Sequence, residues 1–92
     1  MQIIKKIAKT LDLNPAELEK ESLKFFLEKE LKNVEVEIYR LANRHGVKSV
    51  LELDEKLKRG EIKEEEILDD FEELEFFEIK KEKLLEALQK IK

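Results

Sequence analysis

Residues 14–46, NPAELEKESLKFFLEKELKNVEVEIYRLANRHG, are the longest stretch of the chain that predicts one helix. No glycine or proline lies between Pro15 and Gly46, and large apolar residues recur there in steps of three and four, as along a coiled-coil seam: Leu23, Leu27, Leu31, Val34, Ile38 and Leu41. Asn14 is expected to cap the helix start, Pro15 to occupy its first turn, and Gly46 to end it in the left-handed conformation. A rod of roughly 45 Å needs a partner along its length.

A short helix is expected before this rod, from about Gln2 to Leu11. Its apolar residues fall on one stripe: Ile3, Ile4, Ile7, Ala8 and Leu11. After the turn, the Glu17 side chain is expected to accept a hydrogen bond from the amide of the capping residue, Asn14. Leu13 is expected to pack on Leu18. Since so short a helix is marginal alone, it must pack on the rest of the chain.

Two further helices are expected after Gly46. Ser49 with Glu52 predicts a capped short helix that ends at Arg59-Gly60. From about Ile62 a second long helix is expected to reach the C-terminus. Its apolar stripe is interrupted by Lys81 and consists of Ile67, Phe71, Leu74, Phe77, Leu84, Leu88 and Ile91. No Ser, Thr, Asp or Asn caps its start, but three glutamates there complement the helix dipole.

These segments predict an all-α fold with one domain over residues 1–92. The two long helices have similar lengths and a short connector, so antiparallel packing buries both seams in a long hairpin. The first helix is expected to fold back over one end. Two glycines and one proline supply too few turns for a sheet of many short strands.

The composition indicates a highly charged protein of the cytosol. Charged residues make up 46% of the chain, about twice the usual share, and this Lys/Glu enrichment is typical of thermophilic sources. There is no cysteine for a disulfide or a thiolate metal site. Lysines interrupt the apolar residues near the N-terminus, so neither a signal peptide nor a membrane span is expected.

The aromatic residues Phe25-Phe26 and Phe76-Phe77 occur as neighbours. Adjacent residues on a helix point about 100° apart, so each doublet is wider than one narrow seam. Either the two short helices cover these rings, or the rings line a groove for a partner or a second copy. We expect a homodimer.

The segment from Glu61 to Glu78 carries ten carboxylates against Lys63 alone, a local charge of about −9. It is either a solvated face or a surface that attracts a basic protein partner. Together, the aromatic and acidic features give these candidate partner-binding residues: Phe25, Phe26, Glu66, Asp69, Asp70, Glu73, Phe76 and Phe77.

Catalytic, cofactor-binding and metal-binding residues are not expected. The acidic segment lacks the Glu-x-x-His pairing of di-iron bundles, and no EF-hand loop occurs. His45 lies at a predicted helix end, where it would meet free carbonyls, and no base accompanies Ser22, Ser49 or Thr10. Both glycines end helices, so they form no phosphate-binding loop.

Nucleic-acid binding is disfavoured by the net charge of −4 and the pI near 5.2. The basic residues form two short patches: Lys5, Lys6 and Lys9, and Arg40, Arg44 and Lys48.

Two resemblances add to this interpretation. Residues 3–31, with the turn Leu11-Asp12-Leu13-Asn14-Pro15-Ala16-Glu17-Leu18, resemble the two helices of ribbon-helix-helix proteins. Only Met1 and Gln2 stand where that family has its DNA-reading strand. Residues 44–53, 58–62 and 69–74 are similar to small archaeal and bacterial antitoxin-like helical proteins. The second resemblance implies that the acidic last helix wraps a basic toxin such as a ribonuclease.

The sequence therefore predicts a non-enzymatic, antitoxin-like protein-protein interaction module that uses apolar seams and an acidic face. A structural homo-oligomer is the alternative. A metal-dependent enzyme ranks last.

Overall fold

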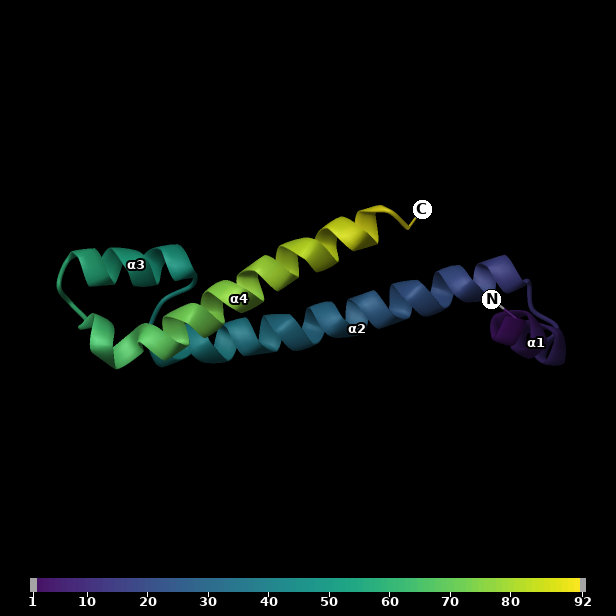
Figure 1. Cartoon of the computed structure of the whole chain (residues 1–92), viewed down its shortest axis with the longest axis horizontal. Helices are drawn as coiled ribbons and strands as arrows, with labels where there is room; N and C mark the ends of the chain where they lie inside the picture. Colours follow the sequence, from purple (N-terminus) through teal and green to yellow (C-terminus); the bar gives the residue numbers. More distant parts are fainter. Residues whose placement is uncertain (1, 92) are drawn as a thin grey trace.

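The computed structural model describes residues 2–91 and contains four α-helices in that range. They are α1 (Gln2–Leu11), α2 (Pro15–Arg44), α3 (Val50–Lys58) and α4 (Glu64–Gln89), and no strand occurs among the described residues. The expected all-α hairpin is confirmed. Helices α2 and α4 run antiparallel, α3 lies beside the closed end of the hairpin, and α1 lies at the opposite end (Figure 1). The molecule measures 61 × 19 × 18 Å.

The helix ends follow the predicted capping residues. Asn14 Oδ1 accepts hydrogen bonds from the amides of Ala16 and Glu17 at 2.9 and 3.1 Å. Gly46 has φ +66°, the left-handed conformation expected after α2. Ser49 Oγ accepts from the Glu52 amide at 3.3 Å and so caps α3.

Some local predictions need correction. The Glu52 carboxylate accepts from the Lys48 amide at 2.6 Å, one residue before the cap. Within residues 2–91 the Glu17 carboxylate accepts no hydrogen bond from the Asn14 amide. Only the half of that capping box in which Asn14 Oδ1 accepts from the Glu17 amide is formed. The last helix spans Glu64–Gln89, shorter at both ends than the expected range, whose final residue, Lys92, lies outside the described residues.

The hydrophobic core lies where the end of α2, the connector and the first half of α4 meet. Its buried members are Leu41, Ala42, Val47, Leu53, Ile67 and Leu74. Phe71 and Phe77 pack against this core while remaining partly exposed. The core therefore occupies the closed end of the hairpin.

The apolar seam of α2 is covered along only part of its length, which corrects the prediction that the two seams face each other throughout. Leu41 and Val34 are buried, Leu27 and Leu31 are half-buried, and Leu23 is exposed. Helices α2 and α4 diverge toward the C-terminus of α4, and the start of α2 projects beyond α4 (Figure 1).

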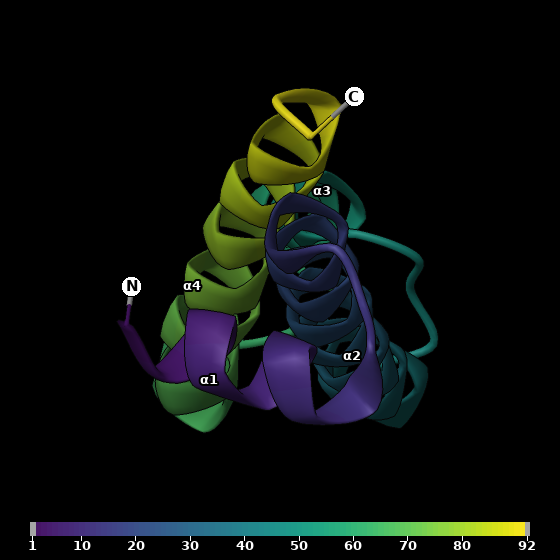
Figure 2. The same cartoon turned by 90° about the vertical axis from the view of Figure 1, so that its right-hand side faces the viewer.

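Helix α1 folds back on its own chain, as expected, but it packs on α2 rather than closing the hairpin. It lies crosswise to α2 when the molecule is viewed along its length (Figure 2). Ala8 is the buried residue of α1, while Ile3, Ile7 and Leu11 are exposed.

Candidate functional site

An ion-pair cluster joins the end of α2 to the first half of α4. Arg44 Nη1 donates to Asp70 Oδ2 at 2.8 Å, and His45 Nε2 lies 2.8 Å from the same oxygen. The hydrogen bond with His45, aided by Arg44 and opposed by partial burial, lowers the pKa of the Asp70 carboxyl from its ordinary value. The side chain of His45 was expected to cap its own helix, but it binds across the hairpin instead.

The basic residues of α2 partly neutralise one flank of the acidic segment. Arg40 pairs with Glu37 at 2.8 Å and reaches Glu73 at 4.0 Å. Arg44 pairs with Asp70 in the same way. Two of the basic residues considered as a nucleic-acid-binding patch, Arg40 and Arg44, therefore face carboxylates of α4. This arrangement reduces the like-charge repulsion that the sequence implied.

Helix α3 is held between its two neighbours by polar contacts. Glu78 Oε2 of α4 accepts from the Val50 amide at 3.2 Å, at the positive end of the α3 dipole. Lys56 Nζ of α3 donates to the His45 carbonyl at 3.0 Å, which satisfies a free acceptor at the end of α2. Glu78 therefore has a structural contact within the hairpin.

The side of α4 that faces away from α2 combines large apolar residues with carboxylates. Leu68, Phe76 and Ile79 are 45%, 59% and 47% exposed. Helical spacing places them on one stripe with exposed acids. We call this surface the outer face of α4, formed by Leu68, Asp69, Glu72, Glu75, Phe76 and Ile79.

The structure separates the predicted partner-binding residues into four groups. Asp69 and Phe76 lie on the outer face of α4. The other acids, Glu66, Asp70 and Glu73, fall by their spacing on the flank of α4 nearer α2. Phe77 packs against the core, and the exposed Phe25 and Phe26 lie farther along α2 toward α1.

Of the two interpretations of the aromatic doublets, cover by the short helices is wrong for Phe25, Phe26 and Phe76, because all three rings are exposed. The outer face also includes Leu68, Glu72, Glu75 and Ile79, which are not among the predicted partner-binding residues. The sequence pattern could have predicted this face, because Leu68, Glu72 and Phe76 recur every four residues on the side of the helix opposite the buried stripe of Ile67, Phe71 and Leu74.

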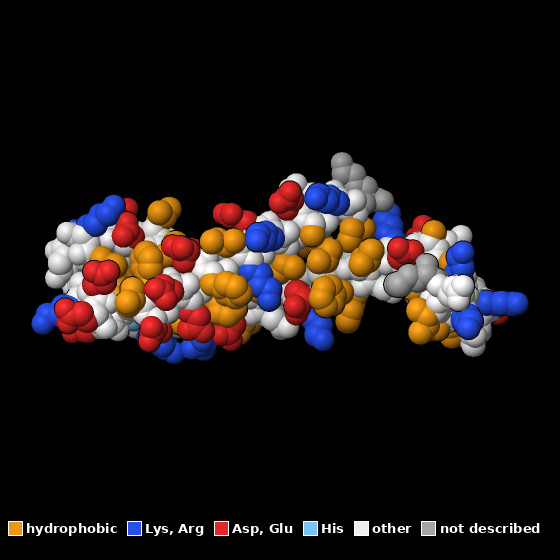
Figure 3. Space-filling view, viewed as in Figure 1, with side chains coloured by type: hydrophobic (Ala, Val, Ile, Leu, Met, Phe, Trp, Pro, Cys, Tyr) orange, Lys and Arg blue, Asp and Glu red, His pale blue; other side chains and the backbone are white. Residues whose placement is uncertain are grey.

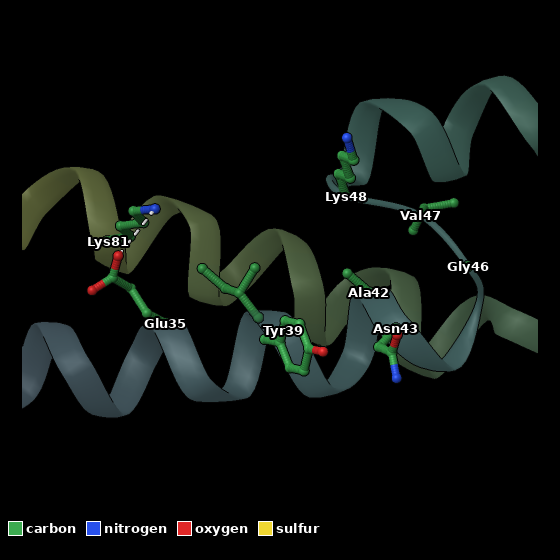
Figure 4. Close-up of a pocket in the computed structure, with 9 residues that line it drawn as sticks. Glu35, Tyr39, Ala42, Asn43, Gly46, Val47, Lys48 and Lys81 are labelled. Carbon is green, nitrogen blue, oxygen red and sulfur yellow. Dashed lines mark ion pairs between the residues drawn. The ribbon is translucent and has the colours of Figure 1, made fainter.

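A pocket of about 540 Å³ lies where α2 and α4 meet the connection to α3 (Figure 4). Its lining includes Ile38, Tyr39, Ala42 and Val47. Lys81 of α4 spans one side and pairs with Glu35 of α2 at 3.6 Å. This pair explains why a lysine interrupts the apolar stripe of α4.

The described residues contain neither a metal-binding cluster nor a membrane-spanning helix. No set of three or more His, Cys, Asp or Glu side chains is arranged to bind a metal ion in this range. None of the helices described is both long and apolar enough to span a membrane.

The fold and surface define a class of small all-α proteins. They are helical hairpins with a strongly charged exterior and an apolar core concentrated at the closed end. Within that class, the chain belongs to the family described as "Uncharacterized protein MJ0235 family", whose model matches residues 1–92. It is similar to the "Uncharacterized protein MJ0235" of Methanocaldococcus jannaschii, with 46% identity over 68 residues, covering 74% of this chain and 82% of that protein. No solved structure matches the chain.

Proposed function

We propose that the chain is a non-enzymatic protein-protein interaction module that binds a basic, amphipathic partner through the outer face of α4. The observation that carries this proposal is the exposure of Leu68, Phe76 and Ile79 on one stripe among carboxylates. Large exposed apolar groups within a charged rim are typical of protein interaction sites.

Charge on this face adds to the argument. The acids Asp69, Glu72 and Glu75 form no ion pair within residues 2–91, whereas Asp70 and Glu73 on the flank meet arginines of α2. The outer acids therefore keep their negative potential toward solvent. A focused patch of one sign speeds the encounter with an oppositely charged partner.

The resemblance of residues 44–53, 58–62 and 69–74 to antitoxin-like proteins supports a particular kind of partner. An antitoxin neutralises a toxin by covering it, and a nucleic-acid-cleaving toxin carries basic residues that bind phosphate. An apolar stripe edged with carboxylates suits such a surface. We therefore propose a basic toxin as the partner class.

The test is co-expression of the chain with the products of its neighbouring genes, followed by calorimetric titration of any basic partner. The charge-reversed variant Asp69→Lys, Glu72→Lys, Glu75→Lys is expected to weaken binding by roughly tenfold or more, and binding of the unmodified chain should weaken as salt rises. Glu21→Lys, Glu28→Lys, Glu55→Lys makes the same change in net charge at exposed sites on α2 and α3, away from the outer face. Equal losses in both variants would contradict a docking site on α4.

A structural homo-oligomer without another partner is the second candidate. It is favoured by the exposed apolar residues of α1 and the first half of α2. Self-association with no binding to any co-expressed basic protein would support this role over the first.

A further inference from the structure

The first half of α2 continues an apolar seam beyond the point where its own chain covers it. Exposure along the seam rises from 0% at Leu41 and 3% at Val34 to 49% at Leu23. Among the described residues, the ion pair between α2 and α4 that lies farthest from the closed end of the hairpin joins Glu35 to Lys81. Beyond it the two helices diverge (Figure 1). A helical seam with such spacing is normally covered by another helix.

Helix α1 and the turn after it extend this uncovered surface. Ile3, Ile7 and Leu11 recur every four residues and are all exposed, while Ala8, at the edge of the same stripe, is buried. The exposed large apolar residues of this end are Ile3, Ile7, Leu11, Leu13, Leu23, Phe25 and Phe26. Hydrophobic side chains also gather along the groove between α2 and α4 and on one side of α1 in the view of Figure 3.

The area involved is large enough for a dimer. Phe25 points to the side of α2 opposite Leu23 and is left out of the area. With about 200 Å² for a large apolar side chain, the exposed fractions of the other six residues amount to roughly 650 Å². That is above the largest apolar patch of a typical monomer and close to the contribution of each partner in a stable complex.

Charge identifies a second copy of the chain as the occupant. Residues 2–11 contain Lys5, Lys6 and Lys9 and no acid, whereas residues 12–22 contain four acids and only Lys20. The two neighbouring segments therefore carry about +3 and −3. Within residues 2–91 no ion pair joins one segment to the other, so these charges are available to another chain.

We propose that residues 2–33, the N-terminal arm, form an isologous homodimer interface. Under a two-fold axis, α1 of one copy lies against residues 12–26 of the other, so the basic segment meets the acidic segment twice. The exposed stripe of α1 then covers Leu23 and Phe26 of the partner copy. The acidic segment 61–78, at about −9 in each chain, would repel itself and stays outside this interface.

The decisive experiment compares Phe26→Glu with Phe76→Glu by sedimentation equilibrium of the full chain. The two rings are matched in exposure, at 57% and 59%, so neither variant removes a buried side chain. We expect the unmodified chain and Phe76→Glu to dimerise alike, and Phe26→Glu to raise the dimer Kd by roughly thirty-fold or more. A monomeric unmodified chain, or a dimer lost in Phe76→Glu and retained in Phe26→Glu, would overturn the proposal.

The charge arrangement has its own test. Lys5→Glu, Lys6→Glu, Lys9→Glu makes both segments of the arm acidic, and Glu17→Lys, Glu19→Lys, Glu21→Lys makes both basic. Each variant alone should dimerise weakly, while an equimolar mixture should form a heterodimer that dissociates as salt rises. A mixture that remains monomeric would refute the proposed contact.

Spin labels can locate the two-fold axis because the chain has no native cysteine. Labels on Ser22→Cys, inside the arm, should lie close together across the dimer. Labels on Glu55→Cys in α3, at the opposite end of the 61 Å molecule, should lie much farther apart. The reverse order of distances would exclude an interface in the arm. This inference is independent of the proposed function, since binding of a basic partner and dimerisation are measured separately.

Discussion

Asp70 illustrates how one carboxylate can be placed by contacts from a distant part of the chain. Its side chain is 19% exposed and shares one oxygen between Arg44 and His45. Since these contacts hold the Asp70 pKa below its ordinary value, they favour the ionised form in the folded state. The resulting stabilisation is present above about pH 4 and is lost as pH falls through the lowered folded-state pKa.

We predict that Asp70→Asn lowers the free energy of unfolding by about 1 kcal/mol at neutral pH. The difference from the unmodified chain should disappear below the lowered pKa, where Asp70 itself is protonated. Urea denaturation across the acid range measures both effects. Asp69→Asn, on the exposed outer face, is the control, and an equal loss there would show that the contacts of Asp70 have no special role.

Val34 and Val36 provide a matched pair of substitutions two residues apart on α2. Val34 is 3% exposed and lies on the seam, whereas Val36 is 56% exposed. Val34→Asp should destabilise the fold by more than about 3 kcal/mol, because it buries an unpaired charge. Val36→Asp should change stability by within about 0.5 kcal/mol. Thermal melting followed by circular dichroism distinguishes the two, and similar melting temperatures would contradict the assigned faces of α2.

At the residue scale, local interactions were predictable and distant ones were not. Asn14, Ser49 and Gly46 act within a few residues of their own position, so their roles could be inferred from the neighbouring sequence. His45 has its partner 25 residues away on another helix. No local pattern predicts that contact.

At the scale of the element, α3 depends on caps from two sources. Ser49 Oγ accepts from the Glu52 amide, and Glu78 of α4 accepts from the Val50 amide. The helix has nine residues, so it is too short to be stable without such contacts. Its N-terminus is therefore a sensitive position.

We predict that Ser49→Ala lowers the free energy of unfolding by about 1 kcal/mol. Ser22→Ala, within an exposed stretch of α2, should be neutral or stabilise by up to about 0.5 kcal/mol, because alanine is the better helix former. Chemical denaturation of both variants measures the contrast. A loss of similar size at Ser22 would argue against a capping role for Ser49.

The existence and order of all four helices were predicted from apolar spacing and capping residues. The bounds of α1 were also predicted correctly, while α4 is shorter at both ends than expected. Lys81 appeared only as an interruption of the α4 stripe. Its pairing with Glu35 needs the antiparallel alignment of two helices, which spacing within one helix does not specify.

At the scale of the whole molecule, two exposed apolar surfaces are separated along the long axis. One is the outer face of α4 near the closed end of the hairpin, and the other is the N-terminal arm (Figure 1). Their charges differ, with the first strongly acidic and the second divided between basic and acidic segments. Phe76→Glu and Phe26→Glu should therefore affect partner binding and dimerisation separately.

The sequence by itself determined the helices, their caps and the hairpin, because apolar periodicity, N-cap residues and left-handed glycines act over one or two turns. Only the tertiary structure decided where α4 leaves α2, which carboxylates meet arginines, and which rings stay exposed. Those features depend on how two long rods cross, and the crossing is set by the combined packing of all side chains at the contact rather than by any single segment.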